Sequence, residues 1–413
     1  MHYFNSIKLT GWRQFSEVEI DLSRPVTVLT GQNGCGKTTI LNILSRHFGW
    51  NLSFVSTPFW GKRKTQQFWS DVAHRRFEEF EESANEASQV GEIVYDDGAR
   101  CTLQTTKVVS PQYQLTQVGQ QPVVGLHIPS HRPPAVYHAV GQIPTNPTTA
   151  QQQYQNFQQL LAQTYGPGTN NIRNPGGIQK QSIISLALFG YGNQAVQANP
   201  EFRRIFEEFQ GILMKVLPKE LGFQRLEVRM PEVVLVTDSG EFSLDAMSGG
   251  INALFGIAWQ IHMYGATADK CTVTIDEPEN HLHPSMQRSL LPSLAEAFPR
   301  YRFIIATHSP FIVSSFPLAS VYGLIFGDDN RVTSHRLELA DLAGTPNRVL
   351  REILDVPSNL PIWVEKEIES VMGQHGEEDI KVRARMIMTK LKELGLTEAL
   401  AEFRSGSEDE KVK

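Results

Sequence analysis

Several features that mark other classes of protein are scarce in this 413-residue chain. No apolar run reaches the roughly 18 to 20 residues that a membrane-spanning helix needs, and the N-terminus has no basic segment followed by an apolar one. We therefore expect no membrane partner and a cytoplasmic location. The 3 cysteines are too few for a disulfide framework, and none lies in a C-x-x-C pair that would indicate zinc.

Positive charge is also limited. Acidic residues outnumber basic ones by 44 to 38, and the formal net charge is −6. This balance argues against a protein whose whole surface binds nucleic acid, although the basic stretches 62–64 and 74–76 could contact phosphates. With 40% hydrophobic residues, the chain can bury one large core or two smaller ones.

The strongest positive signal is a glycine-rich loop that fits the pattern G-x-x-x-x-G-K-[ST] at every fixed position. An apolar strand over 25–30 precedes the loop and a helix over 38–44 follows it, which is the order that a phosphate-binding loop requires. Glycines let backbone N–H groups wrap a triphosphate, while Lys37 meets the β- and γ-phosphates and Thr38 ligates Mg²⁺. The predicted nucleotide-binding residues of this loop are Gln32, Asn33, Gly34, Cys35, Gly36, Lys37, Thr38 and Thr39.

Two adjacent carboxylates end a second apolar strand, at 273–278. Asp276 is expected to hold Mg²⁺, and Glu277 to orient and polarise the attacking water. A third apolar strand is followed by His308, which the rule for parallel sheets brings to the same edge as the phosphates. The alternatives are a solvated acidic turn and a structural histidine, and the phosphate loop disfavours both.

A second anion-binding site is expected at Ser248, Gly249 and Gly250, which open a predicted helix over 251–264. Two anion sites in one chain suggest that two copies share one nucleotide. For this tripeptide taken alone, an ordinary helix cap is the alternative.

The remaining patterns outline the rest of the chain. Alternating residues predict an N-terminal hairpin over 7–22, and helical spacing predicts helices at 61–86 and 202–216. The Gln-, Asn-, Pro- and Gly-rich stretch 111–182 reads as loops around one helix near 154–162. Further strands are predicted at 91–95, 101–109, 226–230, 233–237, 241–244, 270–275 and 302–307, and helices at 364–403 before a frayed tail.

In order along the chain, these motifs resemble the Walker A, signature, Walker B with D-loop, and switch-histidine motifs of ABC-type ATPases. The opening segment 9–15 (LTGWRQF) is similar to that of SMC/RecF-like and OLD-family ATPases. Residues 276–284 (DEPENHLHP) are similar to the same segment in ATPase subunits of Septu and retron-associated anti-phage systems. Cys35, Met247 and Ile251 depart from the usual serine, leucine, and glutamine or glutamate of these motifs.

The resemblance implies an α/β fold, an ABC-type P-loop ATPase head with a mostly parallel core sheet, antiparallel N-terminal strands, an inserted helical lobe and C-terminal helices. The expected parts are an N-terminal ATPase half (1–60), a helical or irregular lobe (61–225), a C-terminal ATPase half (226–345) and a C-terminal helical segment (346–413). It also implies a homodimer or higher homo-oligomer in which the Walker A loop of one copy and Ser248 to Gly250 of another enclose ATP. Arg13 and Arg132 would lie near the nucleotide, and His308 would be the switch residue.

Two functions remain open at this point. The first is an ATP-hydrolysing sensor or scaffold in anti-phage defence, acting with a separate effector protein that is a nuclease or toxin. The second is a RecF/SMC-like repair or recombination ATPase that binds duplex DNA. A transporter motor fits the motif spellings less well, and the N-K-x-D motif of GTPases does not occur. OLD-family nucleases carry a Toprim domain after the switch histidine, which 363–367 matches only faintly, so no built-in nuclease is expected.

Overall fold

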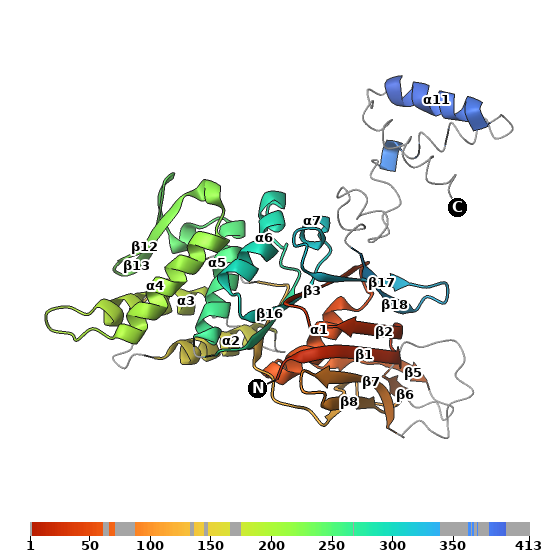
Figure 1. The fold of residues 1–413 in the computed structure, drawn as a ribbon, viewed down its shortest axis with the longest axis horizontal. Coiled ribbons are helices and arrows are strands. Elements are labelled where there is room, and N and C mark those ends of the chain that lie inside the picture. Colours follow the sequence, from red (N-terminus) through yellow and green to blue (C-terminus); the bar gives the residue numbers. More distant parts are fainter. Residues whose placement is uncertain are drawn as a thin grey trace. The chain divides into compact units, whose positions relative to one another are not determined.

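The computed structural model describes most of the chain in segments separated by gaps (Figure 1). The described residues are 2–60, 66–70, 87–132, 136–143, 148–165, 175–266, 268–338, 362–364, 366, 370 and 380–393. They belong to two compact units, Met1–Asp355 and Val356–Lys413, each of which is described by itself.

The larger unit is built on one 11-stranded mixed sheet, with the strand order β10-β8-β7-β1-β2-β18-β17-β3-β16-β15-β11. The strands are β1 Phe4–Trp12, β2 Phe15–Asp21, β3 Val26–Gly31, β7 Ser88–Tyr95, β8 Arg100–Thr105, β10 Thr116–Val118, β11 Gly125–Ile128, β15 Cys271–Asp276, β16 Tyr301–Ala306, β17 Ser320–Phe326 and β18 Val332–Leu337. Three small sheets accompany it: β4 Phe54–Val55 with β9 Gln112–Tyr113, β5 Thr57–Trp60 with β6 Gln66–Trp69, and β12 Phe223–Arg229 with β13 Glu232–Thr237 and β14 Gly240–Ser243.

Five neighbouring strands, β17, β3, β16, β15 and β11, run parallel. Every residue of β3 and of β15 is buried, as is typical of parallel strands that are covered on both faces. The carboxyl ends of β3, β15 and β16 therefore meet at one edge of the sheet. The segments that follow these ends contain the phosphate loop, the paired carboxylates and His308, so the predicted parallel core is confirmed.

The other half of the sheet is largely antiparallel. β1 pairs with β2 through a two-residue turn in which Trp12 lies opposite Phe15. Phe4, Ile7, Leu9 and Trp12 of β1 are buried, while its most exposed residues lie between them. The predicted N-terminal hairpin is confirmed. Strands β7, β8 and β10 extend the same sheet, so the sheet continues past the boundary expected at residue 61.

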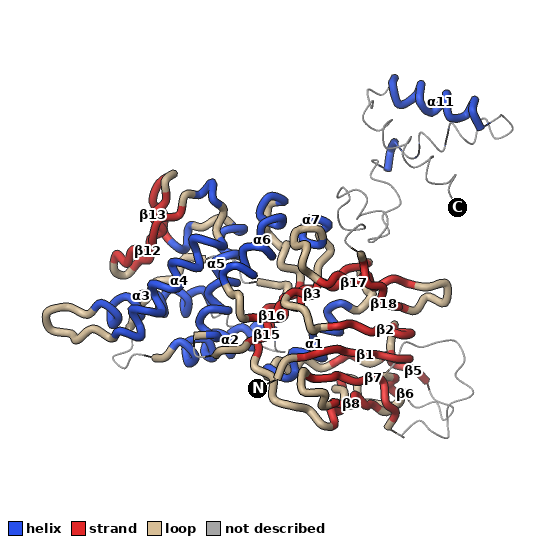
Figure 2. The backbone as a smooth tube through the Cα atoms, in the orientation of Figure 1, coloured by secondary structure: helices blue, strands red, loops and turns tan. Residues whose placement is uncertain are grey.

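The helices of this unit are α1 Lys37–Ser45, α2 Ala150–Tyr165, α3 Pro175–Tyr191, α4 Pro200–Val216, α5 Gly249–Gly265, α6 Pro284–Ala297 and α7 Pro310–Val313. Figure 2 shows α3, α4 and α5 gathered at one end and the antiparallel strands at the other. The predicted amphipathic helix is α4, which Asn199 caps by accepting from the N–H groups of Glu201 and Phe202. Its apolar stripe packs on α5, with the Phe209 and Phe255 rings 5.3 Å apart.

Two expectations about the middle of the chain need revision. Residues 175–191 form the helix α3, which the sequence pattern assigned in part to loops. Apolar and small residues surround α3 on most sides, and ten of its 17 residues are buried, so no one-sided stripe marks it in the sequence. Within the helix predicted at 61–86, Gln66–Trp69 is a strand paired with Thr57–Trp60. Except for Ser70, the rest of that prediction lies outside the described residues.

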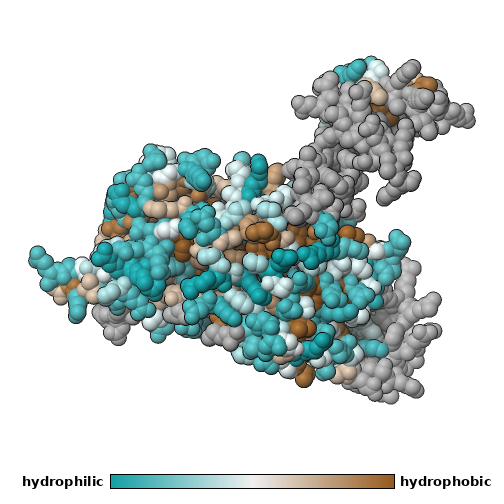
Figure 3. Space-filling view, in the orientation of Figure 1, coloured by the Kyte–Doolittle hydropathy of each residue, from teal (hydrophilic) through white to brown (hydrophobic). Residues whose placement is uncertain are grey.

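In the C-terminal unit the main described element is the helix α11, Ile380–Glu393. The rest of the predicted helical stretch at 364–403 is largely outside the described residues. Figure 3 shows a mostly hydrophilic face over the described part of the larger unit. Among the helices that the structure describes, none combines the length and hydropathy needed to cross a bilayer.

Candidate active site

The loop after β3 has a backbone that only glycine adopts readily. Gly31, Gly34 and Gly36 have φ angles of +138°, +81° and +100°. A Cβ atom on Gly31 would lie 2.3 Å from the carbonyl oxygen of Leu324, and one on Gly36 would lie 2.4 Å from the ring of Phe15. The glycines of the motif are therefore required by both conformation and space.

The helix α1 begins directly behind this loop. Its first backbone bond inside the chain is from the N–H of Ile40 to the carbonyl of Gly36. The N–H groups of Lys37, Thr38 and Thr39 donate to no backbone acceptor in the described segments. Free N–H groups at a helix N-terminus, together with the helix dipole, form a site that suits phosphate oxygens.

Lys37 is folded back onto the loop that precedes it. Its ammonium nitrogen lies 2.9 Å from the carbonyl oxygens of both Gly31 and Gln32, and 3.5 Å from the sulfur of Cys35. Burial lowers the pKa of Lys37, while Cys35 and the nearby carboxylates act in the opposite direction. The side chain is held by carbonyl oxygens that an anionic ligand can replace.

Thr38 and Asp276 lie together at the strand ends. The Thr38 hydroxyl donates to Oδ2 of Asp276 at 2.9 Å, and Oδ1 of Asp276 is buried without a hydrogen-bond partner in the described part of the chain. Burial, with a contribution from the charge of Glu277, raises the pKa of Asp276 to about 6. A hydroxyl and an under-coordinated carboxylate are oxygen donors of the kind that Mg²⁺ prefers, so these residues fit the ion.

Glu277 follows in a backbone conformation that is uncommon outside glycine, with φ +45°. Its N–H donates to the carbonyl of Ala306 at 2.8 Å. One side-chain oxygen lies 3.7 Å from Nε2 of His308, and the other accepts from the Asn280 amide at 3.1 Å. Burial and the charge of Lys37 lower the pKa of His308. The strained backbone and the side-chain contacts hold the Glu277 carboxylate next to the histidine.

Two further side chains at this site were not assigned a role from the sequence. Glu279 accepts from the backbone N–H of His308 at 2.7 Å, and its other oxygen is buried without a partner among the described residues. Burial raises the pKa of Glu279. Asn280 donates to the backbone carbonyl of Ser130 as well as to Glu277. Their only sequence signal is their position directly after the paired carboxylates.

Arg132 joins the segment after β11 to the segment after β15. Its guanidinium lies 3.1 Å from the carbonyl of Glu277, 3.4 Å from that of Pro278 and 3.3 Å from that of Asn280. These contacts fix the main chain on which the Glu277 side chain is mounted. Arg132 was expected near the nucleotide, and the structure gives it contacts to this segment.

Arg13 lies in the β1–β2 turn with φ +53°. Its guanidinium carbon is 5.8 Å from the centre of the Trp12 ring and 5.6 Å from that of Phe54. The same turn reaches the phosphate loop, since a Cβ atom on Gly36 would lie 2.4 Å from the Gln14 amide nitrogen. Gln14 is a neighbour of the loop that the sequence did not single out.

The segment Ser248–Gly250 begins α5. Ser248 is the N-cap residue, but its side chain makes no capping hydrogen bond, and both Ser248 and Gly249 are exposed. Cβ atoms built on Gly249 and Gly250 would lie nearest to His281 and Met286. The structure thus brings Lys37, Thr38, Asp276, Glu277 and His308 together, and it sets Ser248–Gly250 beside the segment after the paired carboxylates.

Comparison with known proteins agrees with the motifs. A family model described as "AAA domain" matches residues 6–116, and one described as "AAA domain, putative AbiEii toxin, Type IV TA system" matches residues 197–314. The chain is 26% identical to the Retron Ec83 probable ATPase of Escherichia coli over 24% of its own length and 21% of that protein. It is 21% identical to the Septu protein PtuA of Bacillus thuringiensis over 40% of its length and 46% of that protein.

The chain is a relative of the SMC/RecF-like ATPases. The resemblance predicted from the motifs is thereby confirmed, and the chain matches less than half the length of these curated relatives. Solved SMC head domains also align with it. The head from Thermotoga maritima has 13% identity and a TM-score of 0.39 over 81% of this chain and 99% of that one. An SMC head bound to the C-winged helix domain of ScpA has 15% identity and a TM-score of 0.42 over 82% and 99%.

Proposed function

We propose that this chain hydrolyses ATP with Mg²⁺ at the edge of the sheet where β3, β15 and β16 end. The observation that carries the proposal is the convergence of Lys37, Thr38, Asp276, Glu277 and His308 at that edge. The loop N–H groups and Lys37 bind the triphosphate, and Thr38 and Asp276 hold the metal. When bound, Mg²⁺ neutralises charge on the phosphate oxygens during transfer.

Glu277 acts as the base in this proposal. Its carboxylate is oriented by Asn280 and lies beside His308, so a water between Glu277 and the terminal phosphate can be polarised for attack. Because burial and Lys37 lower the pKa of His308, its ring is neutral near pH 7 and can accept or donate a hydrogen bond according to its tautomer. Glu279 holds the His308 backbone and thereby orients the switch residue.

A second copy of the chain completes the site. The exposed N-terminus of α5 has a serine hydroxyl that caps nothing within its own chain, which leaves it available to a phosphate of another copy. ATP enclosed between Lys37 of one copy and Ser248 of the other would hold the two copies together, and hydrolysis would release them.

The Glu277→Gln variant tests both the base and the dimer. Steady-state hydrolysis should fall by about 100-fold or more, because the amide cannot take a proton from water. ATP should remain bound, so light scattering after gel filtration should find a dimer with ATP and a monomer without it. Glu220→Gln, an exposed change on the short helix Lys219–Leu221, is the matched control. Equal turnover by Glu277→Gln and wild type would remove Glu277 from this role.

For the biological role, we propose a sensor or scaffold in anti-phage defence that acts with a separate effector, a nuclease or toxin. The similarity to a retron ATPase and to Septu PtuA supports it. A DNA repair or recombination ATPase is the alternative. Isolation of the native complex followed by mass spectrometry should find a small nuclease or toxin. ATP-dependent, salt-sensitive binding of duplex DNA by the chain alone would instead favour the alternative.

A further inference from the structure

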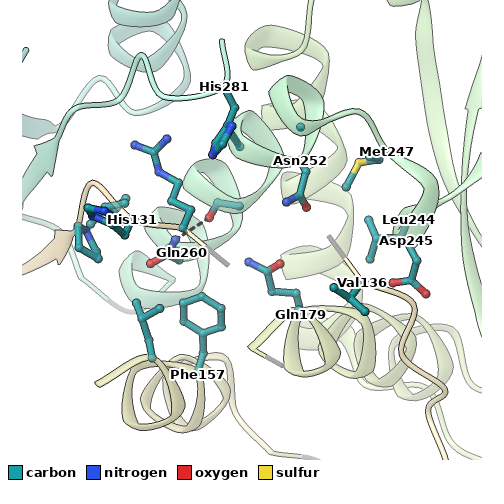
Figure 4. Close-up of a pocket in the computed structure, with 18 residues that line it drawn as sticks. His131, Val136, Phe157, Gln179, Leu244, Asp245, Met247, Asn252, Gln260 and His281 are labelled. Atoms are coloured by element: carbon teal, nitrogen blue, oxygen red, sulfur yellow. Dashed lines mark hydrogen bonds between the residues drawn. The ribbon is translucent and has the colours of Figure 1, made fainter. Parts of the chain in front are cut away.

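A separate cavity of about 480 Å³ lies behind the segment Ser248–Gly250. Its walls come from α2, α3, α5 and the segment after β11, and Met247 and Gly249 form part of its lining. Figure 4 shows this cavity with His281 at one side and Phe157 at the other. Cavities of this size hold small organic ligands the size of a nucleoside or a nucleotide.

Uncompensated carboxamides mark the centre of this cavity. Gln179 of α3 is only 8% exposed, and its side-chain amide makes no hydrogen bond to any residue that the structure describes. The half-buried Asn252 of α5 likewise has no side-chain hydrogen bond within those segments. In Figure 4 the two amides point into the hollow toward one another. A buried polar group without a partner is costly, so this arrangement favours an occupant that satisfies it.

The surrounding residues leave room for the Gln179 amide and restrict what it can bind. Gly256 has no side chain, and a Cβ atom there would lie 3.6 Å from the Gln179 amide nitrogen. Gln260 is occupied on its donor side by the carbonyl of Gly256 at 3.1 Å. Phe157 provides an aromatic surface and packs on the buried Trp259 at 5.1 Å between ring centres. Polar amides above an aromatic wall suit a planar, apolar-faced molecule with a polar edge.

We infer that the cavity binds a purine base, carried by a nucleoside or a nucleoside monophosphate. A carboxamide offers an N–H donor and a carbonyl acceptor side by side, which matches the adjacent acceptor and donor on a purine edge. Gln179 and Asn252 read this edge, and Phe157 contacts the base face. This site is distinct from the phosphate loop, because its lining contains no residue of Gly31–Thr39.

Occupancy has a consequence for the ATPase. Met247 and Gly249 line the cavity, so a bound base lies against the start of α5. The base would therefore alter how Ser248 meets the ATP of a second copy. This consequence rests on the proposed function, whereas the binding of the base does not.

Calorimetric titration of the full chain tests the inference. Adenosine and guanosine, which lack phosphates, are titrated into the wild type; AMP and GMP are titrated into Lys37→Ala, in which the phosphate loop is disabled. We expect at least one purine compound to bind with a dissociation constant below about 1 mM. Tighter binding by the monophosphates than by the nucleosides identifies a nucleotide as the ligand, and equal binding identifies a nucleoside.

Two substitutions decide where the base binds. Gln179→Leu should weaken binding at least about tenfold, and Asn252→Leu should do the same if the first variant fails to fold. Gln151→Leu on the exposed face of α2 is the matched control and should bind as the wild type does. Absence of purine binding up to about 5 mM overturns the inference, as does binding that neither cavity substitution weakens. Neither result depends on whether the chain hydrolyses ATP.

Discussion

Asp276→Asn is predicted to make the ligand-free protein more stable above pH 6, although the aspartate is the proposed metal ligand. Burial raises the pKa of Asp276 from 3.8 to about 6, so keeping this carboxylate charged destabilises the folded state at neutral pH. A difference of about two pKa units corresponds to about 3 kcal/mol, which is the upper limit of the expected gain. Asparagine keeps an oxygen that can accept from the Thr38 hydroxyl.

The effect has a definite dependence on pH. The folded protein binds the Asp276 proton more tightly than the unfolded chain does, so the stability contributed by this proton is fully present below pH 3.8 and is lost as the pH rises through about 6. The advantage of asparagine should therefore be largest at about pH 8 and should disappear at about pH 4.

Urea denaturation with a metal chelator and without nucleotide measures this advantage. Asp269→Asn is the matched control, because that side chain is 97% exposed and should change stability by no more than about 0.5 kcal/mol. The reasoning is refuted if Asp276→Asn is no more stable than the wild type at about pH 8, or if its gain is the same at both pH values.

Three further outcomes are expected. Lys37→Ala should weaken ATP binding at least about tenfold in an equilibrium binding assay, because a charge-assisted contact to phosphate is lost. Lys180→Met should lower the free energy of unfolding by about 3 to 5 kcal/mol, since Lys180 is fully buried between Glu232 at 2.5 Å and Asp245 at 2.6 Å; a variant as stable as wild type would contradict this. Gly190→Ala should lower the melting temperature, because its Cβ would lie 2.7 Å from the backbone nitrogen of Arg203, and an unchanged melting temperature would mean that the α3–α4 contact relaxes freely.

Local patterns were enough to predict much of the fold. The phosphate loop, the apolar strands of the parallel core and the amphipathic stripe of α4 depend on residues close together in the chain, and the structure has each of these elements. The helix α3 could not be found in this way. Its hydrophobic residues are distributed around the whole helix, and only burial by α2, α4 and the strands around it explains why this pattern is stable.

What the sequence by itself determined is the inventory of phosphate-binding and acidic groups and their order along parallel strands, because the glycine-lysine loop and strand-end carboxylates are recognisable from adjacent residues. The tertiary structure alone decided which distant groups meet. It brings Glu279 to the backbone of His308, encloses Lys180 between two carboxylates, and leaves the amide of Gln179 facing a cavity. These contacts join residues 29 to 65 positions apart, so they depend on how strands and helices pack and leave no periodic signal in the chain.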